Sequence, residues 1–152
     1  MSGTESASTP GARQRTRHRA REAAVQMLYQ WEVGQTSIDE VLQTYWAADL
    51  PGAQGANEAT KAFAEELVRS TVANIPKIDP LIAETAEHWR LSRMAALDRL
   101  ILRLAISEFL HGDTPRNVVI NEALELAKTF SGEESAKFIN GILDAVKKKL
   151  NA

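Results

Sequence analysis

The chain of 152 residues carries 18 lysines and arginines against 20 aspartates and glutamates, giving a formal net charge of -2, and it contains no cysteine. A chain of this length can bury a core without disulfides or metals, and the absence of cysteine excludes disulfide bonds, thiolate zinc sites and a cysteine nucleophile. With this charge balance the attraction of nucleic acid by the protein as a whole is expected to be weak, so any such binding must come from a local patch.

The start of the chain combines a polar segment with a cluster of basic residues. Small and polar residues dominate positions 1–13, which we expect to form a disordered tail, and residues 14–152 are expected to form a single helical domain. Five arginines occupy alternate positions: Arg13, Arg15, Arg17, Arg19 and Arg21. Apolar residues at helical spacing predict a first helix from about Arg17 to Val33, which ends at Gly34.

The middle of the chain is expected to contain three helices. Ser37 and Glu40 have the spacing of a capping box and predict a second helix through Trp46. A loop over 49–57 precedes a third helix at 58–74, which we expect to end before Pro76. Asp79, placed before Pro80, predicts the start of a short fourth helix.

The last third of the chain is also predicted to be helical. Ser92 is the expected start of a fifth helix, and the few polar residues between 94 and 110 predict that this helix is the most buried one. Thr114 and Pro115 predict the start of a sixth helix over 116–130, and Ser131 with Glu134 predicts a seventh. The sequence therefore predicts an all-α protein, a compact orthogonal bundle of about seven helices.

Signatures of catalysis and of metal binding are missing from the sequence. The three histidines, His18, His88 and His111, lie in different segments without a second ligand at a chelating spacing. The sequence lacks a phosphate-binding glycine loop, a nucleophile elbow and a serine triad. The longest mainly apolar stretch, 97–110, is too short and too charged to span a bilayer, and residues 1–12 lack the apolar segment of a secretory signal. We therefore expect a non-enzymatic, cytoplasmic protein without cofactor or metal.

The arginine cluster is suited to binding single-stranded nucleic acid. In a continuous helix Arg13, Arg17 and Arg21 would share one face and the other two arginines would lie nearly opposite, so a flexible or partly helical arm is expected to wrap a phosphate backbone better. Tyr29 lies two helical turns beyond Arg21 and is a candidate for stacking on bases, although a place in the core or at a protein partner is an equal alternative.

Three segments in order resemble the NusB family of bacterial transcription antitermination factors. Residues 17–29 resemble the opening helix of that family, and residues 98–108 look like its central helix. Residues 118–130, followed by 137–144, are similar to its C-terminal signature. The resemblance implies an all-helical RNA-binding protein that pairs with NusE, a small-subunit ribosomal protein, on the boxA sequence of ribosomal RNA transcripts, within the RNA polymerase antitermination complex.

The resemblance also implies roles for particular residues. The arginine-rich motif corresponds to Arg17, Arg19 and Arg21, with Arg15 beside it, and the RNA surface should continue to Lys137 and Phe138. Two further residues, Tyr29 and Asp98, match positions at or near the NusE face.

Several alternatives remain open from the sequence. Phe138 has core spacing, Asp98 could pair with an arginine of another helix, and Gly141 could allow close packing of the last two helices. Similar helical domains occur in ribosomal RNA cytosine methyltransferases, so a role as an RNA-targeting module is a second hypothesis, and a protein-only scaffold is a third. A homodimer could cover the RNA surface.

Overall fold

The computed structural model describes residues 10–48, 50, 53–86 and 91–151. Every regular element in these segments is a helix, as predicted. None of the described helices is long and apolar enough to cross a membrane. The chain divides into two compact units, residues 1–69 and 70–152, which are described separately below. The single domain expected for 14–152 stays a prediction.

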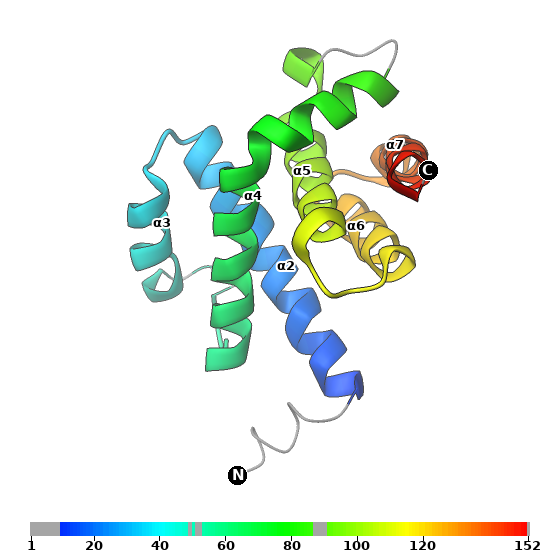
Figure 1. The fold of residues 1–152 in the computed structure, drawn as a ribbon. Coiled ribbons are helices and arrows are strands. Elements are labelled where there is room, and N and C mark those ends of the chain that lie inside the picture. Colours follow the sequence, from blue (N-terminus) through cyan, green and yellow to red (C-terminus); the bar gives the residue numbers. More distant parts are fainter. Residues whose placement is uncertain (1–9, 49, 51–52, 87–90, 152) are drawn as a thin grey trace. The chain divides into compact units, whose positions relative to one another are not determined.

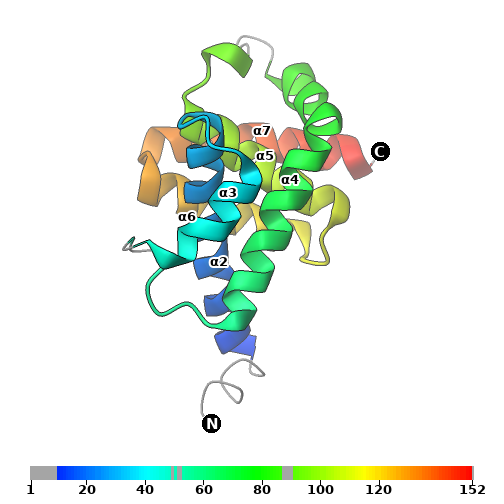
Figure 2. The same cartoon turned by 90° about the vertical axis from the view of Figure 1, so that its left-hand side faces the viewer.

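The first unit contains α2 (Pro10–Glu32), α3 (Ile38–Thr44), the 3-10 helix η1 (Tyr45–Ala47) and the first part of α4 (Glu58–Thr85). α3 packs against α2 (Figure 2). The buried residues of α2 include the small Ala20, Ala23 and Ala24 as well as the larger Met27 and Leu28. Tyr45 is 1% exposed and donates a hydrogen bond of 2.5 Å to Gln26 Oε1. Burial raises the pKa of Tyr45 to about 12, so this donor keeps its proton at neutral pH.

The first helix begins earlier than the sequence predicts. α2 starts at Pro10 rather than near Arg17, so Arg13 and Arg15, which were expected before the helix, also lie on it. Proline is well tolerated here because the first turn of a helix does not use its backbone N–H groups. Residues 10–13 of the expected disordered tail are helical, and residues 1–9 lie outside the described part of the chain.

The α3 helix begins as predicted. Ser37 is its N-cap, and its hydroxyl accepts a hydrogen bond of 3.2 Å from the backbone N–H of Glu40. This bond satisfies one of the donors that the first turn leaves unused. The helix ends at Thr44 and continues into η1 through the expected Trp46.

The third and fourth predicted helices are one continuous helix. α4 runs from Glu58 to Thr85 and contains both Pro76 and Pro80. Each proline removes one intrahelical hydrogen bond, which makes a break the usual outcome. Here both prolines lie on the exposed side, while Ile78 and Ile82 are fully buried one turn apart. Tertiary packing of these two side chains therefore outweighs the local cost of the prolines.

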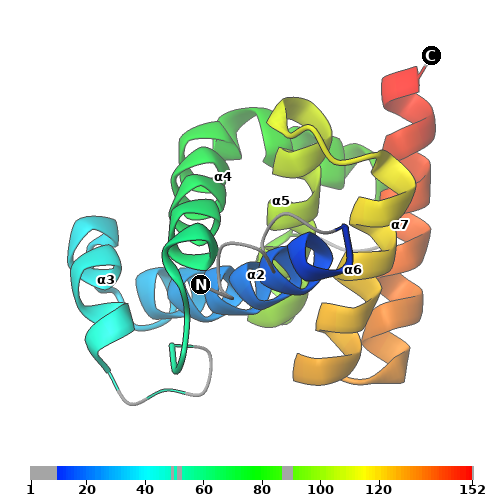
Figure 3. The same cartoon turned by 90° about the horizontal axis from the view of Figure 1, so that it is seen from below.

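The second unit contains the rest of α4, the 3-10 helix η2 (Leu91–Arg93), α5 (Ala96–His111), α6 (Arg116–Phe130) and α7 (Glu133–Asn151). α5 packs against α6 and α7 (Figure 1), and α6 and α7 lie side by side (Figure 3). As predicted, α5 is the most buried helix: its residues from Leu100 to Phe109 are all buried.

Three helix starts differ in detail from the prediction. Ser92 lies in η2, and α5 begins four residues later, at Ala96. α6 has the predicted bounds, but Pro115 occupies the N-cap position in place of Thr114. Ser131 ends α6 rather than capping α7, because Gly132, at φ +125°, reverses the chain between the two helices.

Two arginines of α5 hold neighbouring segments of the second unit. Arg103 is 8% exposed and donates two hydrogen bonds of 2.9 Å to the two carboxylate oxygens of Asp79. Arg103 of α5 is thus paired with an acidic residue of another helix, α4. Arg99 donates to the backbone carbonyls of Leu91 and Met94, so it anchors the segment that precedes α5.

Candidate nucleic-acid interface

The arginines of α2 become less exposed along the helix. Arg13 and Arg15 are exposed, Arg17 and Arg19 are half-buried, and Arg21 is only 3% exposed. Because a helix advances by about 100° per residue, alternate positions point in different directions and meet different surroundings. The five arginines therefore differ in how much of each side chain is exposed to solvent.

An aromatic ring of α4 orders two of these arginines. The guanidinium of Arg17 lies 4.5 Å from the ring centroid of Phe63, and that of Arg21 lies at 5.3 Å. Both distances are within the range of a cation–π interaction, in which the ring quadrupole attracts the positive charge. The half-buried Arg17 presents its remaining surface to solvent, while Arg21 supports the ring from within. Direct contact of Arg21 with RNA would require its side chain to leave this position.

Arg19 holds a loop of the same unit. Its guanidinium donates to the carbonyl of Gly55 at 3.3 Å and also to the carbonyl of Gln54. Gly55 has φ +68°, a conformation that residues with a side chain rarely adopt. Arg19 thus fixes the loop before α4, and its half-buried side chain keeps part of its surface open to a ligand.

A cavity of about 330 Å³ lies between the start of α2 and the start of α4. Basic, acidic, hydroxyl and apolar side chains line it: Arg13, Thr16, Arg17, Ala59, Ala62, Phe63 and Glu66. The arginines and the hydroxyl can donate hydrogen bonds to phosphate oxygens, and Glu66 would oppose a phosphate near its end of the cavity. No local pattern in the sequence reveals that the distant Arg17 covers Phe63.

The other end of α2 exposes apolar side chains. Tyr29 is 41% exposed and Val33 is 47% exposed, one helical turn apart. This exposure excludes the alternative that Tyr29 belongs to the core. Two adjacent exposed apolar residues form a small surface that suits a protein contact better than a phosphate backbone.

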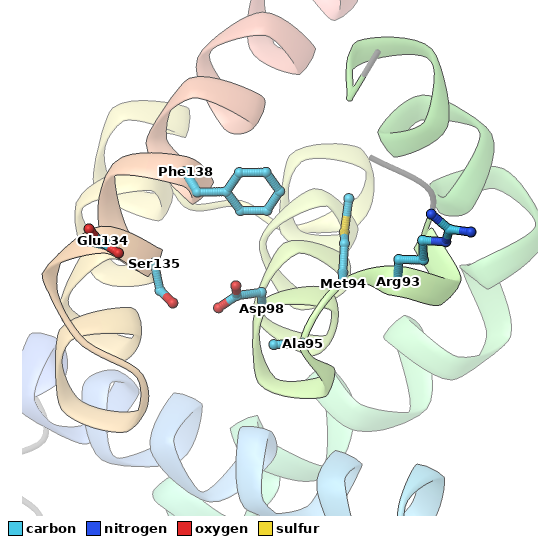
Figure 4. Close-up of a pocket in the computed structure, with 7 residues that line it drawn as sticks. All are labelled: Arg93, Met94, Ala95, Asp98, Glu134, Ser135 and Phe138. Carbon is cyan, nitrogen blue, oxygen red and sulfur yellow. The ribbon is translucent and has the colours of Figure 1, made fainter. Parts of the chain in front are cut away.

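The predicted C-terminal site residues lie at the start of α7. Lys137 is exposed, and Phe138 is half-buried. Phe138 lines a cavity of about 320 Å³ together with Arg93, Met94, Ala95, Asp98, Glu134 and Ser135 (Figure 4). The wall therefore combines an aromatic ring and a thioether with an arginine, a hydroxyl and two carboxylates.

Asp98 is the most unusual residue of this cavity. It lies in the first turn of α5 and is 9% exposed, and its Oδ1 atom is buried without a hydrogen-bond partner. The positive end of the helix dipole favours a carboxylate at this position, but a buried acceptor without a donor still costs stability. The structure thus brings together Asp98, predicted to bind a protein, and Phe138, predicted to bind RNA.

Metal-binding side chains do not gather in the part of the chain that the structure describes: it contains no group of three or more histidine, cysteine, aspartate or glutamate residues suited to hold an ion. The Nε2 atom of His18 instead lies 3.4 Å from Oε2 of Glu22, one helical turn along α2.

Known proteins resemble this chain over most of its length. The model of the NusB family matches residues 18–148. The transcription antitermination protein NusB of Koribacter versatilis (strain Ellin345) is 47% identical over 140 residues, which cover 90% of this chain and 92% of that protein. A solved structure of T. maritima NusB is 35% identical, with a TM-score of 0.76 and coverage of 87% of this chain and 90% of that one.

A further solved structure is described as antitermination factors NusB and NusE in complex with dsRNA. Its matching chain is 28% identical, with a TM-score of 0.76, and the match covers 89% of this chain and 98% of that chain. The fold, the family profile and the identity along almost the whole sequence agree with one another. The chain belongs to the NusB family.

Proposed function

We propose that this protein is a non-enzymatic transcription antitermination factor of the cytoplasm, which binds boxA RNA of ribosomal RNA operons together with NusE and joins the RNA polymerase antitermination complex. The relatives carry the name transcription antitermination protein, and one solved relative is in complex with NusE and RNA. The observation that carries the RNA-binding part is the arginine-rich face of α2, where Arg17 is stacked on Phe63 beside the exposed Arg13 and Arg15.

The arginines of α2 would mainly contact phosphates. Guanidinium groups offer planar pairs of donors that match phosphate oxygens. Arg15 is free to reach a strand through its exposed side chain, whereas Arg17 and Arg19 would bind through the surface that Phe63 and the loop at Gly55 leave open. Arg21 would contribute by holding Phe63 in place. Four phosphate contacts with a single strand predict a slope of log affinity against log salt of about -3.

Lys137 and Phe138 would supply a second set of contacts. Lys137 is exposed and can reach a phosphate, and the half-buried Phe138 offers part of its ring to a base. Glu134 is exposed nearby and would repel phosphate, which fits a protein that needs a partner for tight binding.

The exposed Tyr29 and Val33 are the proposed contact with NusE in the first unit. Asp98 also stays a candidate for NusE binding. Its Oδ1 atom is buried, however, so the partner would have to insert a side chain into the cavity to reach that atom.

Titration of labelled boxA RNA against scrambled RNA, with and without NusE, tests the function. We expect Arg15→Glu to weaken boxA binding several-fold and to reduce the magnitude of the salt slope by about 0.7, as for the loss of one phosphate contact with a single strand. Lys128→Glu is the matched control, because it also reverses one exposed cation but lies on α6, outside both cavities. Equal affinity for boxA and scrambled RNA in the presence of NusE would refute the boxA assignment.

Two further measurements refine the proposal. Single-stranded and double-stranded forms of the RNA are compared in the same titration, since the solved relative was crystallised with dsRNA. Sedimentation at increasing RNA concentration tests for a homodimer: if the dimer covers the RNA surface, RNA should convert it to monomers.

A further inference from the structure

We infer that Phe63 of α4 is a positioning residue for RNA binding, whose ring holds the guanidinium group of Arg17 in place before RNA arrives. This inference rests on the proposed RNA-binding function and deepens it. The affinity of the arginine-rich face of α2 then depends on an aromatic ring of another helix, which itself contacts no phosphate. Both α2 and this part of α4 belong to the first unit.

The ring of Phe63 lies within reach of two guanidinium groups of α2. Its centroid is 4.5 Å from Cζ of Arg17 and 5.3 Å from Cζ of Arg21, which follows Arg17 by one helical turn. Arg17 and Phe63 are half-buried, whereas Arg21 is only 3% exposed. The buried Arg21 therefore fixes the ring, and the ring in turn fixes the arginine that reaches solvent.

A ring and a carbonyl oxygen hold an arginine in different ways. Arg19 donates hydrogen bonds to the carbonyl oxygens of Gly55 and Gln54, and these bonds occupy N–H donors that a phosphate would need. The ring of Phe63 instead attracts the flat face of the Arg17 guanidinium through its quadrupole. Hydrogen bonds from a guanidinium to a phosphate lie in the guanidinium plane, so the ring contact and a phosphate contact can exist together.

Space for a phosphate lies beside this contact. Arg17 and Phe63 both line the cavity of about 330 Å³ between the start of α2 and the start of α4. The α4 wall of this cavity also contains Ala59 and Ala62, whose small side chains keep it wide. Phe63 is the large apolar side chain of that wall, so its removal would widen the cavity and release Arg17 from its place.

An arginine that is ordered before binding raises the affinity. Arginine has one of the largest side-chain entropies, and this entropy is lost when a ligand fixes the side chain. A guanidinium that is held by a ring has lost part of that entropy already in the free protein. The exposed Arg13 and Arg15 would lose theirs only on binding. Phe63 should therefore raise the affinity for RNA without changing the number of phosphates that the protein neutralises.

Replacement of Phe63 by fluorinated phenylalanines in the full chain tests the inference. Each added fluorine withdraws electron density from the face of the ring and changes its shape little, so the cation–π contact weakens stepwise. With boxA RNA and NusE we expect the affinity to fall with each fluorine, by about threefold for trifluorophenylalanine. Phe63→Leu, which removes the ring, should lower it by about fivefold. The slope of log affinity against log salt should stay unchanged, because no phosphate contact is lost.

Phe109 offers the matched control. Its ring centroid lies 5.9 Å from Cζ of Arg116 in the second unit, so it takes part in the same kind of contact outside the arginine-rich face. Fluorinated phenylalanine in place of Phe109 should leave the affinity for RNA unchanged. Equal losses of affinity from fluorination of Phe63 and of Phe109 would show a general effect on the fold and would overturn the inference.

Other outcomes separate the inference from the proposed function. If Phe63→Leu weakens binding but fluorination does not, the side chain acts by packing alone; if fluorination strengthens binding, the ring competes with RNA for Arg17. Either result refutes the inference and leaves the proposed function standing. Because fluorinated rings keep the packing, the test does not depend on whether Phe63→Leu folds.

Failure of the proposed function has a different appearance. If the unaltered protein binds RNA without preference for boxA, the boxA assignment fails, whereas a stepwise effect of fluorine on RNA affinity would still support the role of Phe63. Absence of any RNA binding, with or without NusE, would remove both.

Discussion

The first arginines of α2, in the first unit, and Arg103 of α5, in the second unit, are used in opposite ways. In the first unit, Arg13, Arg15 and Arg17 keep all or part of their surface open to solvent on α2. In the second unit, Arg103 is 8% exposed and held by both oxygens of Asp79. The exposed fraction of its side chain thus shows whether an arginine can bind a ligand or stabilises the fold. The residue type alone does not distinguish the two roles.

Loss of the Asp79 carboxylate should have the largest effect. Asp79→Ala would remove the carboxylate that accepts two hydrogen bonds from the buried Arg103, and we expect the free energy of unfolding to fall by about 2 to 3 kcal/mol, somewhat less than for a fully buried pair because Asp79 is partly exposed. Urea denaturation measures this change. The matched control is Asp39→Ala, which breaks an exposed pair with Arg69 and should cost under about 0.5 kcal/mol. Equal losses for both variants would contradict the structural role of Arg103.

Charge reversal at Arg17 should act on RNA binding. Arg17→Glu is expected to lower affinity for boxA RNA by about tenfold, because it removes a phosphate contact and adds repulsion. Arg17→Lys keeps the charge but loses the planar group above Phe63, so a smaller loss is expected. Fluorescence anisotropy titration at two salt concentrations measures both. If Arg17→Lys is as damaging as Arg17→Glu, then stacking on Phe63, rather than charge, is the contribution of Arg17.

Replacement of Gly141 should stabilise the protein. A close approach of helices was expected at this glycine, but it is exposed on α7 and an added Cβ atom would meet nothing within 4 Å. Gly141→Ala should therefore raise the free energy of unfolding by about 1 kcal/mol, the difference in helix propensity. Thermal unfolding measures the gain. A more stable variant with weaker RNA or NusE binding would show that this face of α7 is an interface. A loss of stability would contradict the finding that a Cβ atom added at Gly141 meets no neighbouring atom.

Tyr29→Ala should change stability least. Its side chain is 41% exposed, so we expect the free energy of unfolding to change by less than about 0.5 kcal/mol, as for most surface substitutions. Affinity for NusE should fall several-fold if Tyr29 is part of that contact, and calorimetric titration measures this. Unchanged NusE affinity would remove Tyr29 from the proposed interface.

Local sequence rules predict this fold well wherever neighbours in the chain decide the structure. The N-cap at Ser37 and the bounds of α6 depend on residues a few positions apart, and both are confirmed. The same rules wrongly predict that α4 ends before Pro76, because contacts with residues from elsewhere in the chain keep this segment helical. Ile78 and Asp79 hold that segment through packing and through Arg103, and no local pattern reports such partners.

The candidate site could be predicted only in part for the same reason. The arginine cluster and the family resemblance identify α2 and the start of α7 from the sequence. Sequence reasoning did not predict that Arg21 lies beneath Phe63, or that Asp98 and Phe138 line one cavity. Both arrangements join residues on different helices, and a single sequence carries no signal for which distant positions meet.

The early start of α2 at Pro10 has a consequence for the thermodynamics of recognition. A disordered basic segment must lose conformational entropy when it folds onto a strand, whereas a preorganised helix has already lost it. Complex formation should then leave the circular dichroism of the protein nearly unchanged, and the heat-capacity change should report buried contact area without coupled folding.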